Sequence, residues 1–280
     1  MILDDQQLAA QTWFRTLRDR ITAEFEAIET EATPDDPGRF TYTPWERADH
    51  TGAAGGGGTM GLMKGHVFEK VGVNISTVHG EFAPEFARTV NGAETDPRFF
   101  ATGISLVAHM RNPHVPAVHM NTRFLVTTKR WFGGGADLNP ALPRPDDTAA
   151  FKQHLRTACD AHDPTYWPRF SQWCDEYFRI PHRNRSRGVG GIFYDHLEAS
   201  DETFAFTRAV GEAFLAAFPP IVRARMAEPY TPDERLALLR YRGLYAEFNL
   251  VYDRGTLFGL KTGGNIDAIL MSLPPEARWD

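Results

Sequence analysis

Histidine, serine, asparagine and arginine side chains are concentrated in two neighbouring stretches of this sequence. In the first stretch Ser105 and His109 alternate with apolar residues, and in the second His119, Asn121 and Arg123 do the same. Alternation with a period of two is typical of a β-strand that has one apolar and one polar face. A guanidinium group binds carboxylates bidentately. The combination predicts a site that suits a ligand with carboxylates.

The elements that must position these groups are two strands joined by a turn, in which Pro113 and Pro116 interrupt ladder pairing. If the strands pair as a hairpin, their polar faces coincide and share one hollow. Taken singly, a histidine is more typical of a structural or surface position, and Arg123 could belong to an ordinary ion pair. The density of polar groups favours a site, because polar groups beside a core need partners such as ligand carboxylates.

Two further segments carry groups of interest. The triplet Gly133–Gly135 predicts an irregular path that leads to Asp137. Arg183, Arg185 and Arg187 occupy alternate positions and would project to one side of an extended segment; a solvated basic loop is an equally good interpretation. In an acidic protein, such a concentration of guanidinium groups suits a small molecule with several negative charges.

Length and composition bound the protein class. A chain of 280 residues with 42% hydrophobic and 12% aromatic residues can form one large domain, which we expect to span residues 1–280. The net charge of −6 argues against nucleic-acid binding. Two cysteines are too few for a disulfide framework and indicate a reducing compartment. No signal peptide or membrane-spanning segment is evident, so we expect a cytoplasmic protein.

Periodicity and turn signals predict the remaining elements. Acidic caps at Asp4 and Asp5 begin a helix that runs to about Thr30, and further helices are expected on both sides of the arginine-rich segment. On one of them His154 shares a stripe with apolar residues and should point inward. Expected strands include 40–48, 67–77, 191–195 and a long one at 244–252, whereas Gly52–Gly61 reads as a loop. Its G-x-G-x-x-G spacing lacks the strand and helix that a dinucleotide site requires.

Short turns between neighbouring strands predict an α+β fold, with a large antiparallel sheet and helices packed on it. With these segments in place, the chain resembles the oxygen-dependent coproporphyrinogen III oxidase family over roughly residues 55–279. The runs that carry the resemblance are Ser105–Phe124, Trp131–Pro140, Trp173–Phe178, His182–Gly188 and Phe248–Gly255.

The resemblance implies a single-domain sheet flanked by helices on both faces, and a homodimer that uses the region from about Leu244 onward. It implies conversion of coproporphyrinogen III to protoporphyrinogen IX in haem biosynthesis. Two propionates are oxidatively decarboxylated to vinyl groups, with molecular oxygen as acceptor and carbon dioxide and hydrogen peroxide as products. No organic cofactor is expected. The four carboxylates of this substrate agree with the need for arginines in an acidic chain.

Residue roles follow from the same resemblance. His119 matches a proposed proton donor, and Asp137 matches an aspartate that engages the pyrrole nitrogens. The matching substrate-binding groups are Ser105, Asn121, Thr122, Arg123, Gly263, Gly264 and Asn265. The last of these is often arginine in the family, so asparagine here leaves one carboxylate contact to another arginine.

A divalent metal is implied for the bacterial branch, at His109, His119, His154 and His182. Their spacing is long and irregular, unlike a short zinc motif, so the residues alone leave hydrogen bonding and carboxylate binding open as their role. Two other functions also stay open. One is a non-catalytic tetrapyrrole-binding protein, which would bind without consuming oxygen. The other is a metal-dependent hydrolase, which would be indifferent to oxygen.

Overall fold

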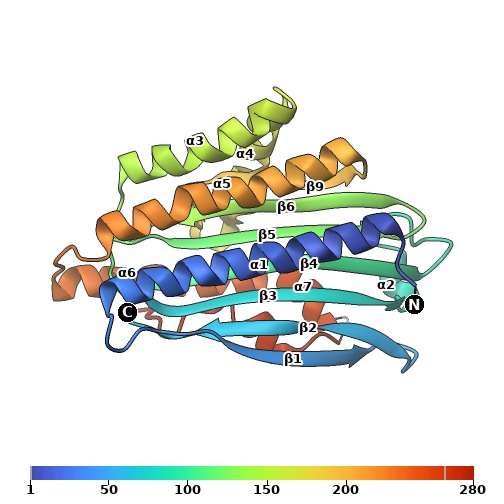
Figure 1. Ribbon diagram of the computed structural model, residues 1–280, viewed down its shortest axis with the longest axis horizontal. Helices are drawn as coiled ribbons and strands as arrows, with labels where there is room; N and C mark the ends of the chain where they lie inside the picture. Colours follow the sequence, from blue (N-terminus) through green and yellow to red (C-terminus); the bar gives the residue numbers. More distant parts are fainter. Residues whose placement is uncertain (1, 262) are drawn as a thin grey trace.

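Seven strands form one antiparallel sheet in the computed structural model, which describes residues 2–261 and 263–280. The spatial order is β1-β2-β3-β4-β5-β6-β9, so strands that follow one another in the chain lie side by side up to β6 (Figure 1). Two short strands, β7 and β8, pair separately. The bounds are β1 Thr41–Ala48, β2 Ala54–Met63, β3 Phe68–Glu81, β4 Arg98–Met110, β5 Ala117–Val126, β6 Arg130–Asn139, β7 Arg179–Ile180, β8 Arg185–Ser186 and β9 Gly191–Glu198.

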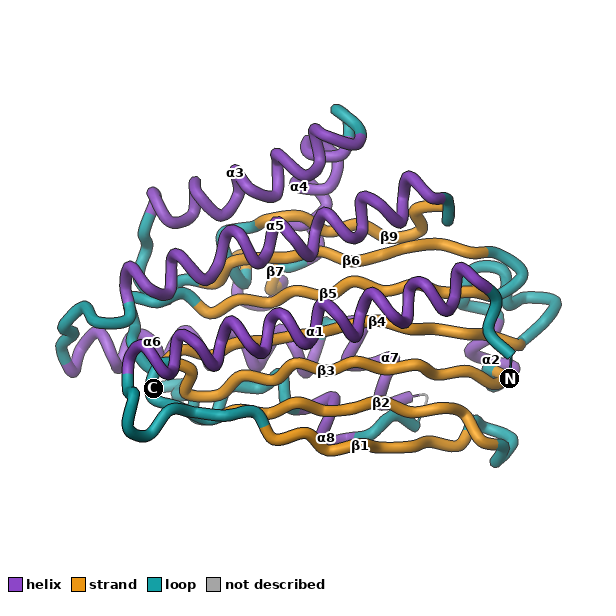
Figure 2. The backbone as a smooth tube through the Cα atoms, viewed as in Figure 1, coloured by secondary structure: helices purple, strands orange, loops and turns teal. Residues whose placement is uncertain are grey.

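Helices cover both faces of the sheet (Figures 1 and 2). The long helices α1 and α5 lie across one face, with α3 packed on α5, and α4 packs on β9. Helices α6, α7 and α8 lie on the opposite face. The predicted α+β fold is therefore confirmed. The helices are α1 Asp5–Ala32, α2 Pro84–Ala87, α3 Pro145–His162, α4 Tyr166–Tyr177, α5 Asp201–Arg225, α6 Pro232–Val251, α7 Arg254–Lys261 and α8 Ile266–Leu270, with a 3₁₀ turn at Pro181–Arg183.

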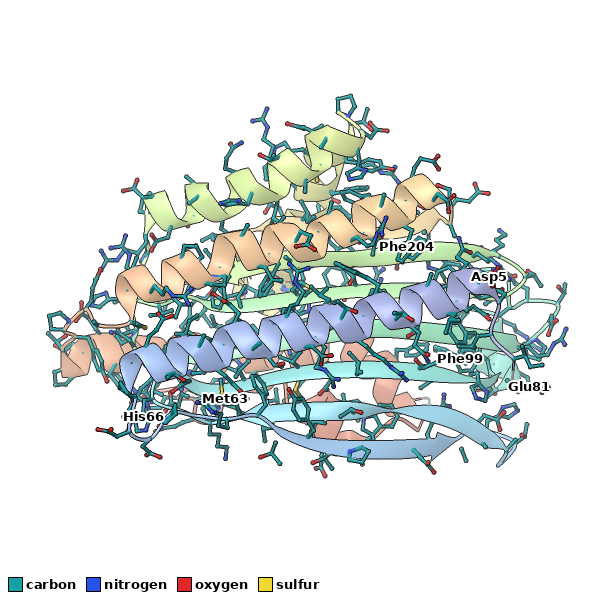
Figure 3. The ribbon with its side chains drawn as sticks, viewed as in Figure 1. Asp5, Met63, His66, Glu81, Phe99 and Phe204 are labelled. Atoms are coloured by element: carbon teal, nitrogen blue, oxygen red, sulfur yellow. The ribbon has the colours of Figure 1, made fainter. Side chains whose placement is uncertain are left out.

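The N-terminal helix forms as its sequence predicts. Asp4 and Gln7 build a capping box, in which each side chain bonds the backbone N–H of the other residue. Apolar residues three and four positions apart then make one fully buried stripe: Ala10, Phe14, Leu17, Ile21, Phe25 and Ile28. This stripe packs on β3 and β4 and supplies one wall of the main core. The long strands extend under it from the end near Met63 and His66 to the end near Glu81 and Phe99 (Figure 3).

Two glycine-rich segments that the sequence assigns to irregular chain are strands. Gly55–Gly58 belong to β2 and Gly133–Gly135 to β6. Lack of room explains glycine at two of these positions. A Cβ at Gly58 would lie 2.6 Å from the Trp45 ring, and one at Gly133 would lie 2.5 Å from the Asp195 carboxylate. Because Gly52–Gly61 leads into a strand and not into a helix, the dinucleotide interpretation of its spacing fails.

The strand predicted at 244–252 is wrong, because these residues continue helix α6 to Val251. The buried positions of this part of the helix include Arg242, Tyr245 and Asn249, which are spaced by three and four residues. Two of the three are polar, so the buried face of the helix is not recognisable as an apolar stripe. The apolar residues between them happen to alternate as they would in a strand.

His154 is also misplaced by the prediction: it is exposed on α3, whose buried stripe is Phe151, Leu155 and Cys159.

Helix α5 is the one described helix that is long and apolar enough to cross a bilayer. Of its most apolar window, 61% is buried within the protein. The helix packs on α1, α3, β5 and β6, and Phe204 near its start stacks on Phe132. Its apolar character is therefore that of a core helix.

Candidate active site

The polar side chains of the central strands meet on one face of the sheet. Strand register pairs Ser105 of β4 with Asn121 of β5, and His119 of β5 with Asp137 of β6. Directly paired residues project to the same side. Arg123 lies two residues beyond Asn121 and shares this side. We call it the polar face, and the opposite, α1- and α5-covered side the core face. The placement agrees with the alternation in the sequence.

A continuous series of hydrogen bonds runs along the polar face. At its outer end Asp195 of β9 forms an ion pair with Arg123, with Nη2 and Oδ2 2.8 Å apart. Arg123 Nη1 donates to Asn121 Oδ1 at 3.1 Å, and Asn121 Nδ2 lies 3.1 Å from His119 Nε2. His119 Nδ1 is 2.8 Å from Asp137 Oδ1. Together with Arg187, which completes the inner end, these residues form what we call the relay.

The inner end of the relay is buried. Arg187 Nη2 donates to Asp137 Oδ2 at 2.6 Å, and Asn139 Nδ2 donates to the same oxygen at 2.8 Å. The two side chains of this ion pair are only 2% and 1% exposed. Burial by itself raises the pKa of Asp137, but the charge of Arg187 and the hydrogen bond from His119 outweigh it and lower the pKa to about 2. The carboxylate is therefore ionised at every physiological pH.

Aromatic rings enclose the guanidinium group of Arg187. Its central carbon lies 4.0 Å from the ring centre of Phe178, 4.7 Å from that of Tyr245 and 4.8 Å from that of Phe248. Such rings present electron-rich faces to a cation and keep water away from it. A second hydrogen bond goes from Nη1 to Asn249 Oδ1 at 3.1 Å. These contacts fix the position of the cation next to Asp137.

Solvent exposure rises along the relay. The side chain of Asp137 is 1% exposed, that of His119 12% and that of Arg123 31%. The imidazole therefore lies between a dry ion pair and a guanidinium that solvent reaches. Glycine at position 133 makes this possible, because a Cβ there would lie 3.0 Å from Arg123 Cζ as well as against Asp195. Such an arrangement can bind an anion at Arg123 and transfer a proton at His119.

Thr122 does not belong to the polar face. It lies between Asn121 and Arg123 in β5, so its side chain points to the core face, where it is fully buried. Its hydroxyl has no hydrogen-bond partner among the residues that the structure describes. Adjacent residues of a strand project to opposite sides, so a run of three consecutive residues cannot supply three side chains to one site. The expectation that Thr122 contacts substrate through its side chain is corrected accordingly.

The three alternate arginines also separate. Residues 181–183 form a 3₁₀ turn and Asn184 is left-handed, with φ of 49°, so the segment is not extended. Arg183 is exposed and pairs with Glu247, Arg185 is exposed, and Arg187 is buried in the relay. The predicted one-sided basic row is wrong. One of its members, Arg187, instead forms the buried ion pair with Asp137.

The four histidines that the resemblance assigns to a metal do not converge. Among the described residues, no three His, Cys, Asp or Glu side chains are placed to hold a metal ion. His109 is buried, with Nε2 at 2.9 Å from the carbonyl oxygen of Ser272, and burial lowers its pKa to about 3. His182 contacts Tyr252 and Glu247, and His154 is exposed on α3. These residues therefore do not fit a shared metal site within one chain.

The turn predicted to bind substrate lies between α7 and α8. Asn265 caps α8 by accepting a hydrogen bond from Ala268 N, and Gly263 has a φ of 70° that favours glycine. The carbonyl of Ala268 in turn accepts from Asn74 of β3 at 2.6 Å. Asn74 pairs with Ser105 in the sheet, so α8 is attached to the polar face beside Ser105. The amide of Asn265 is already engaged in this cap.

Sequence analysis missed Asp195 of the relay and two asparagines that bond its inner end, Asn139 and Asn249. Asp195 and Asn139 could have been found from strand periodicity. Asp195 lies two residues after Phe193 in a predicted strand, and Asn139 lies two residues after Asp137. Asn249 was hidden by the mistaken strand at 244–252. Its contact with Arg187 spans 62 positions and depends on the packing of α6, which no local pattern indicates.

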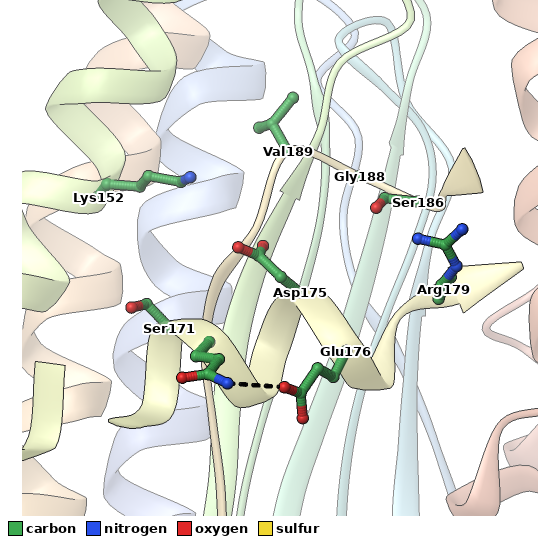
Figure 4. A pocket seen from close by; sticks show the side chains of 9 residues that line it. Lys152, Ser171, Asp175, Glu176, Arg179, Ser186, Gly188 and Val189 are labelled. Carbon is green, nitrogen blue, oxygen red and sulfur yellow. Dashed lines mark hydrogen bonds between the residues drawn. The ribbon is translucent and has the colours of Figure 1, made fainter. Parts of the chain in front are cut away.

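A surface groove of about 660 Å³ lies elsewhere, between α3, α4 and the segment that precedes β9 (Figure 4). Lys152 and Arg179 face it together with Asp175 and Glu176, so its charges are mixed. The interaction drawn within it is a hydrogen bond from Gln172 to Glu176 at 2.9 Å. None of these residues belongs to the relay, and we assign the groove no part in the chemistry.

The fold and the relay together define a class: an α+β protein whose sheet presents, on one face, a carboxylate–imidazole pair and a partly exposed arginine. Comparison with known proteins makes this specific. The family model described as coproporphyrinogen III oxidase matches residues 9–280, and the chain belongs to this family. It is 54% identical over 273 residues to the oxygen-dependent coproporphyrinogen-III oxidase of Rickettsia bellii strain OSU 85-389, covering 96% of each chain. It is 50% identical over 285 residues to that of Rickettsia conorii, covering 100% of each.

Proposed function

We propose that the protein is an oxygen-dependent coproporphyrinogen III oxidase, which forms protoporphyrinogen IX in haem biosynthesis. The observation that carries the proposal is the relay on the polar face, in a chain that matches the family over nearly its whole length. The substrate is a flat macrocycle with four propionates. Arg123 is available to bind a carboxylate, and His119, which Asn121 connects to it, can transfer a proton.

Each decarboxylation has a simple balance. A propionate chain loses carbon dioxide, one proton and two electrons and becomes a vinyl group, while oxygen takes up the two electrons and two protons to give hydrogen peroxide. The reduced macrocycle is electron-rich and reacts with oxygen itself. The protein then has to orient the ring, exclude side reactions and move protons. Ser105, Asn121 and Arg123 supply the binding groups in this proposal, and molecular oxygen is the co-substrate.

The role of Asp137 changes from the one expected on resemblance. Both of its oxygens are already occupied, one by His119 and the other by Arg187 and Asn139. With 1% of the side chain exposed, it has no surface left for pyrrole nitrogens. We infer that Asp137 acts through His119, by orienting the ring and stabilising it when it carries an extra proton.

One assay decides between this activity and simple tetrapyrrole binding. Purified protein is incubated with coproporphyrinogen III in air, and oxygen uptake is followed together with the fluorescence of the oxidised vinyl product. The expected result is coupled oxygen consumption and product formation that His119→Gln abolishes. Binding without oxygen uptake would make the protein a carrier. Activity that proceeds without oxygen and disappears on chelation would point to a metal-dependent enzyme instead.

We further propose a homodimer that uses the end of α6 and the helices after it. Large apolar side chains are exposed there: Leu250 is 49%, Val251 54% and Ile266 60% exposed. Exposed apolar groups clustered in one region are typical of a protein interface. Sedimentation of the wild type and of a Leu250→Glu, Val251→Glu variant tests this, since the variant should be monomeric. A wild-type monomer at micromolar concentration would contradict it.

We also propose a cytoplasmic location. It is supported by α5, whose apolar residues are mostly buried within the protein.

A further inference from the structure

The hydrogen bond between Asn121 and His119 has a direction that chemistry decides. A guanidinium group has donors only. Arg123 Nη1 lies 3.1 Å from one polar atom of the Asn121 amide, so that atom must be the oxygen. The amide nitrogen is consequently the atom turned toward His119, 3.1 Å from Nε2. An amide nitrogen can only donate, so Nε2 must accept and cannot carry a proton in this arrangement.

The inner end of the relay leads to the same result independently. Asp137 forms a buried ion pair with Arg187 and also accepts from Asn139. An ionised carboxylate only accepts hydrogen bonds, so the ring atom 2.8 Å away, His119 Nδ1, must be the donor. Two separate sets of partners therefore require the same form of the ring, neutral and protonated on Nδ1. The edge of Phe178, whose ring centre is 5.8 Å from that of His119, packs against the imidazole.

We propose that Arg187 is a positioning residue for the reaction: it holds the Asp137 carboxylate in place, so that His119 rests as the neutral Nδ1–H tautomer and Nε2 is the atom that accepts a proton. In this proposal His119 first accepts a proton, whereas the family resemblance implies that it donates one. Arg187 itself is only 2% exposed, so its role is to hold Asp137 and not to bind substrate. Asp195 favours the same tautomer from the outer end of the relay, because it holds Arg123 against the amide oxygen of Asn121.

The catalytic consequence rests on the proposed function, whereas the tautomer does not. During each decarboxylation the propionate chain breaks a C–H bond, and its proton passes to Nε2 while the two electrons go to oxygen. His119 is then an imidazolium stabilised by Asp137 through Nδ1–H. It returns to its resting form when Nε2 gives that proton to the reduced oxygen, which takes its second proton from solvent and leaves as hydrogen peroxide. The imidazole is regenerated and the balance closes.

The tautomer can be measured without substrate. In protein labelled with ¹⁵N-histidine, the nitrogen resonances distinguish a protonated ring nitrogen from an unprotonated one, and His119→Gln identifies the signals by their loss. The expected result at neutral pH is a protonated Nδ1 and an unprotonated Nε2. A protonated Nε2 would overturn the proposal even if the enzyme proves fully active. Lack of turnover by the wild type would instead reject the proposed function and leave this measurement valid.

Arg187→Met tests the positioning role, and Arg242→Met is its matched control. Arg242 is also buried, at 1% exposed, and its Nη2 is likewise 2.6 Å from a carboxylate, that of Glu69. Arg187→Met should lose the single tautomer of His119 and lower kcat about 10- to 100-fold, as supporting contacts of catalytic groups typically do, with KM within about twofold. Arg242→Met should lose stability but keep the tautomer and kcat. Unchanged histidine resonances and kcat in Arg187→Met would overturn the proposal.

A variant at the solvent-facing part of the relay keeps the test decisive if Arg187→Met does not fold. Asn121→Asp places an acceptor where Nε2 now finds a donor, so His119 should take up a second proton and become a stable imidazolium. If Nε2 must accept, kcat falls steeply at neutral pH and the ¹⁵N spectrum shows both ring nitrogens protonated. A variant with both nitrogens protonated and undiminished kcat would show that His119 works as a donor, and the proposal would be wrong.

Discussion

The ten residues of strand β5 alternate between two faces that serve different purposes. On the core face Val118, Met120, Thr122 and Phe124 are all fully buried under α1 and α5. On the polar face His119, Asn121 and Arg123 take part in the relay and find partners on β6, on β9 or on β5 itself. One face therefore contributes apolar burial, and the other contributes positioned charge and hydrogen bonds. Substitutions on the core face should change stability, and those on the polar face should change catalysis.

Asp137 is where this division should break, and it gives the largest expected effect. Asp137→Ala leaves the buried Arg187 without its carboxylate, which costs about 3–5 kcal/mol of stability, and leaves His119 unsupported. We expect kcat to fall by about 10²–10⁴-fold. Thermal unfolding and steady-state turnover measure the two losses. The double variant Asp137→Ala, Arg187→Met should regain part of the stability and none of the activity. If it regained both, the carboxylate would have only a structural role.

Arg123 should change substrate binding more than folding. Its side chain is 31% exposed, so a ligand carboxylate can reach it beside its bonds to Asp195 and Asn121. A hydrogen bond to a charged group contributes about 1.5–3 kcal/mol, which corresponds to about a 10- to 100-fold rise in KM for Arg123→Gln. Arg130→Gln is the control, because Arg130 lies on the neighbouring strand and forms a surface pair with Asp4. Equal effects of the two variants on KM would remove Arg123 from the substrate site.

Acid should weaken the polar face before it weakens the core face. The pKa of Asp137 is lowered from 3.8 to about 2, so its contribution is complete above about pH 4 and is lost as the pH falls toward 2. A shift of this size corresponds to about 2 kcal/mol of unfolding free energy. Urea unfolding at pH 5 and pH 2.5 should show this loss in the wild type. The double variant without Asp137 and Arg187 should lose less over the same interval, and an equal loss in both would contradict the assignment.

Features of the fold and site that depend on residues close together in the sequence could be predicted, and features that depend on distant contacts could not. The alternation in residues 104–126 depends on backbone geometry alone, so the pairing of Ser105, His119 and Asn121 on one face followed from it. The cap of α1 was equally local. The glycine triplet was misread because its causes come from other strands; at Gly133 a Cβ would meet Arg123 of β5 and Asp195 of β9. The burial of Arg187 under α6 depends on a contact across 62 positions, whereas the sequence allowed only a row of arginines that binds an anion or a solvated basic loop.

Thr122 gives the smallest expected effect and the sharpest comparison between the two faces. Its buried hydroxyl has no partner in the described part of the chain, and such an unsatisfied group costs about 1–3 kcal/mol. Thr122→Val replaces it by a methyl group of the same shape, so we expect a gain of about 1 kcal/mol in unfolding free energy and unchanged kcat and KM. Differential scanning calorimetry and the turnover assay measure both. If KM rose with stability unchanged, the side chain would reach the substrate, and alternation along β5 would not describe the site. If the expected gain is found, the run that resembles a three-residue substrate motif contributes only its first and third side chains, because a strand gives every second residue to the opposite face.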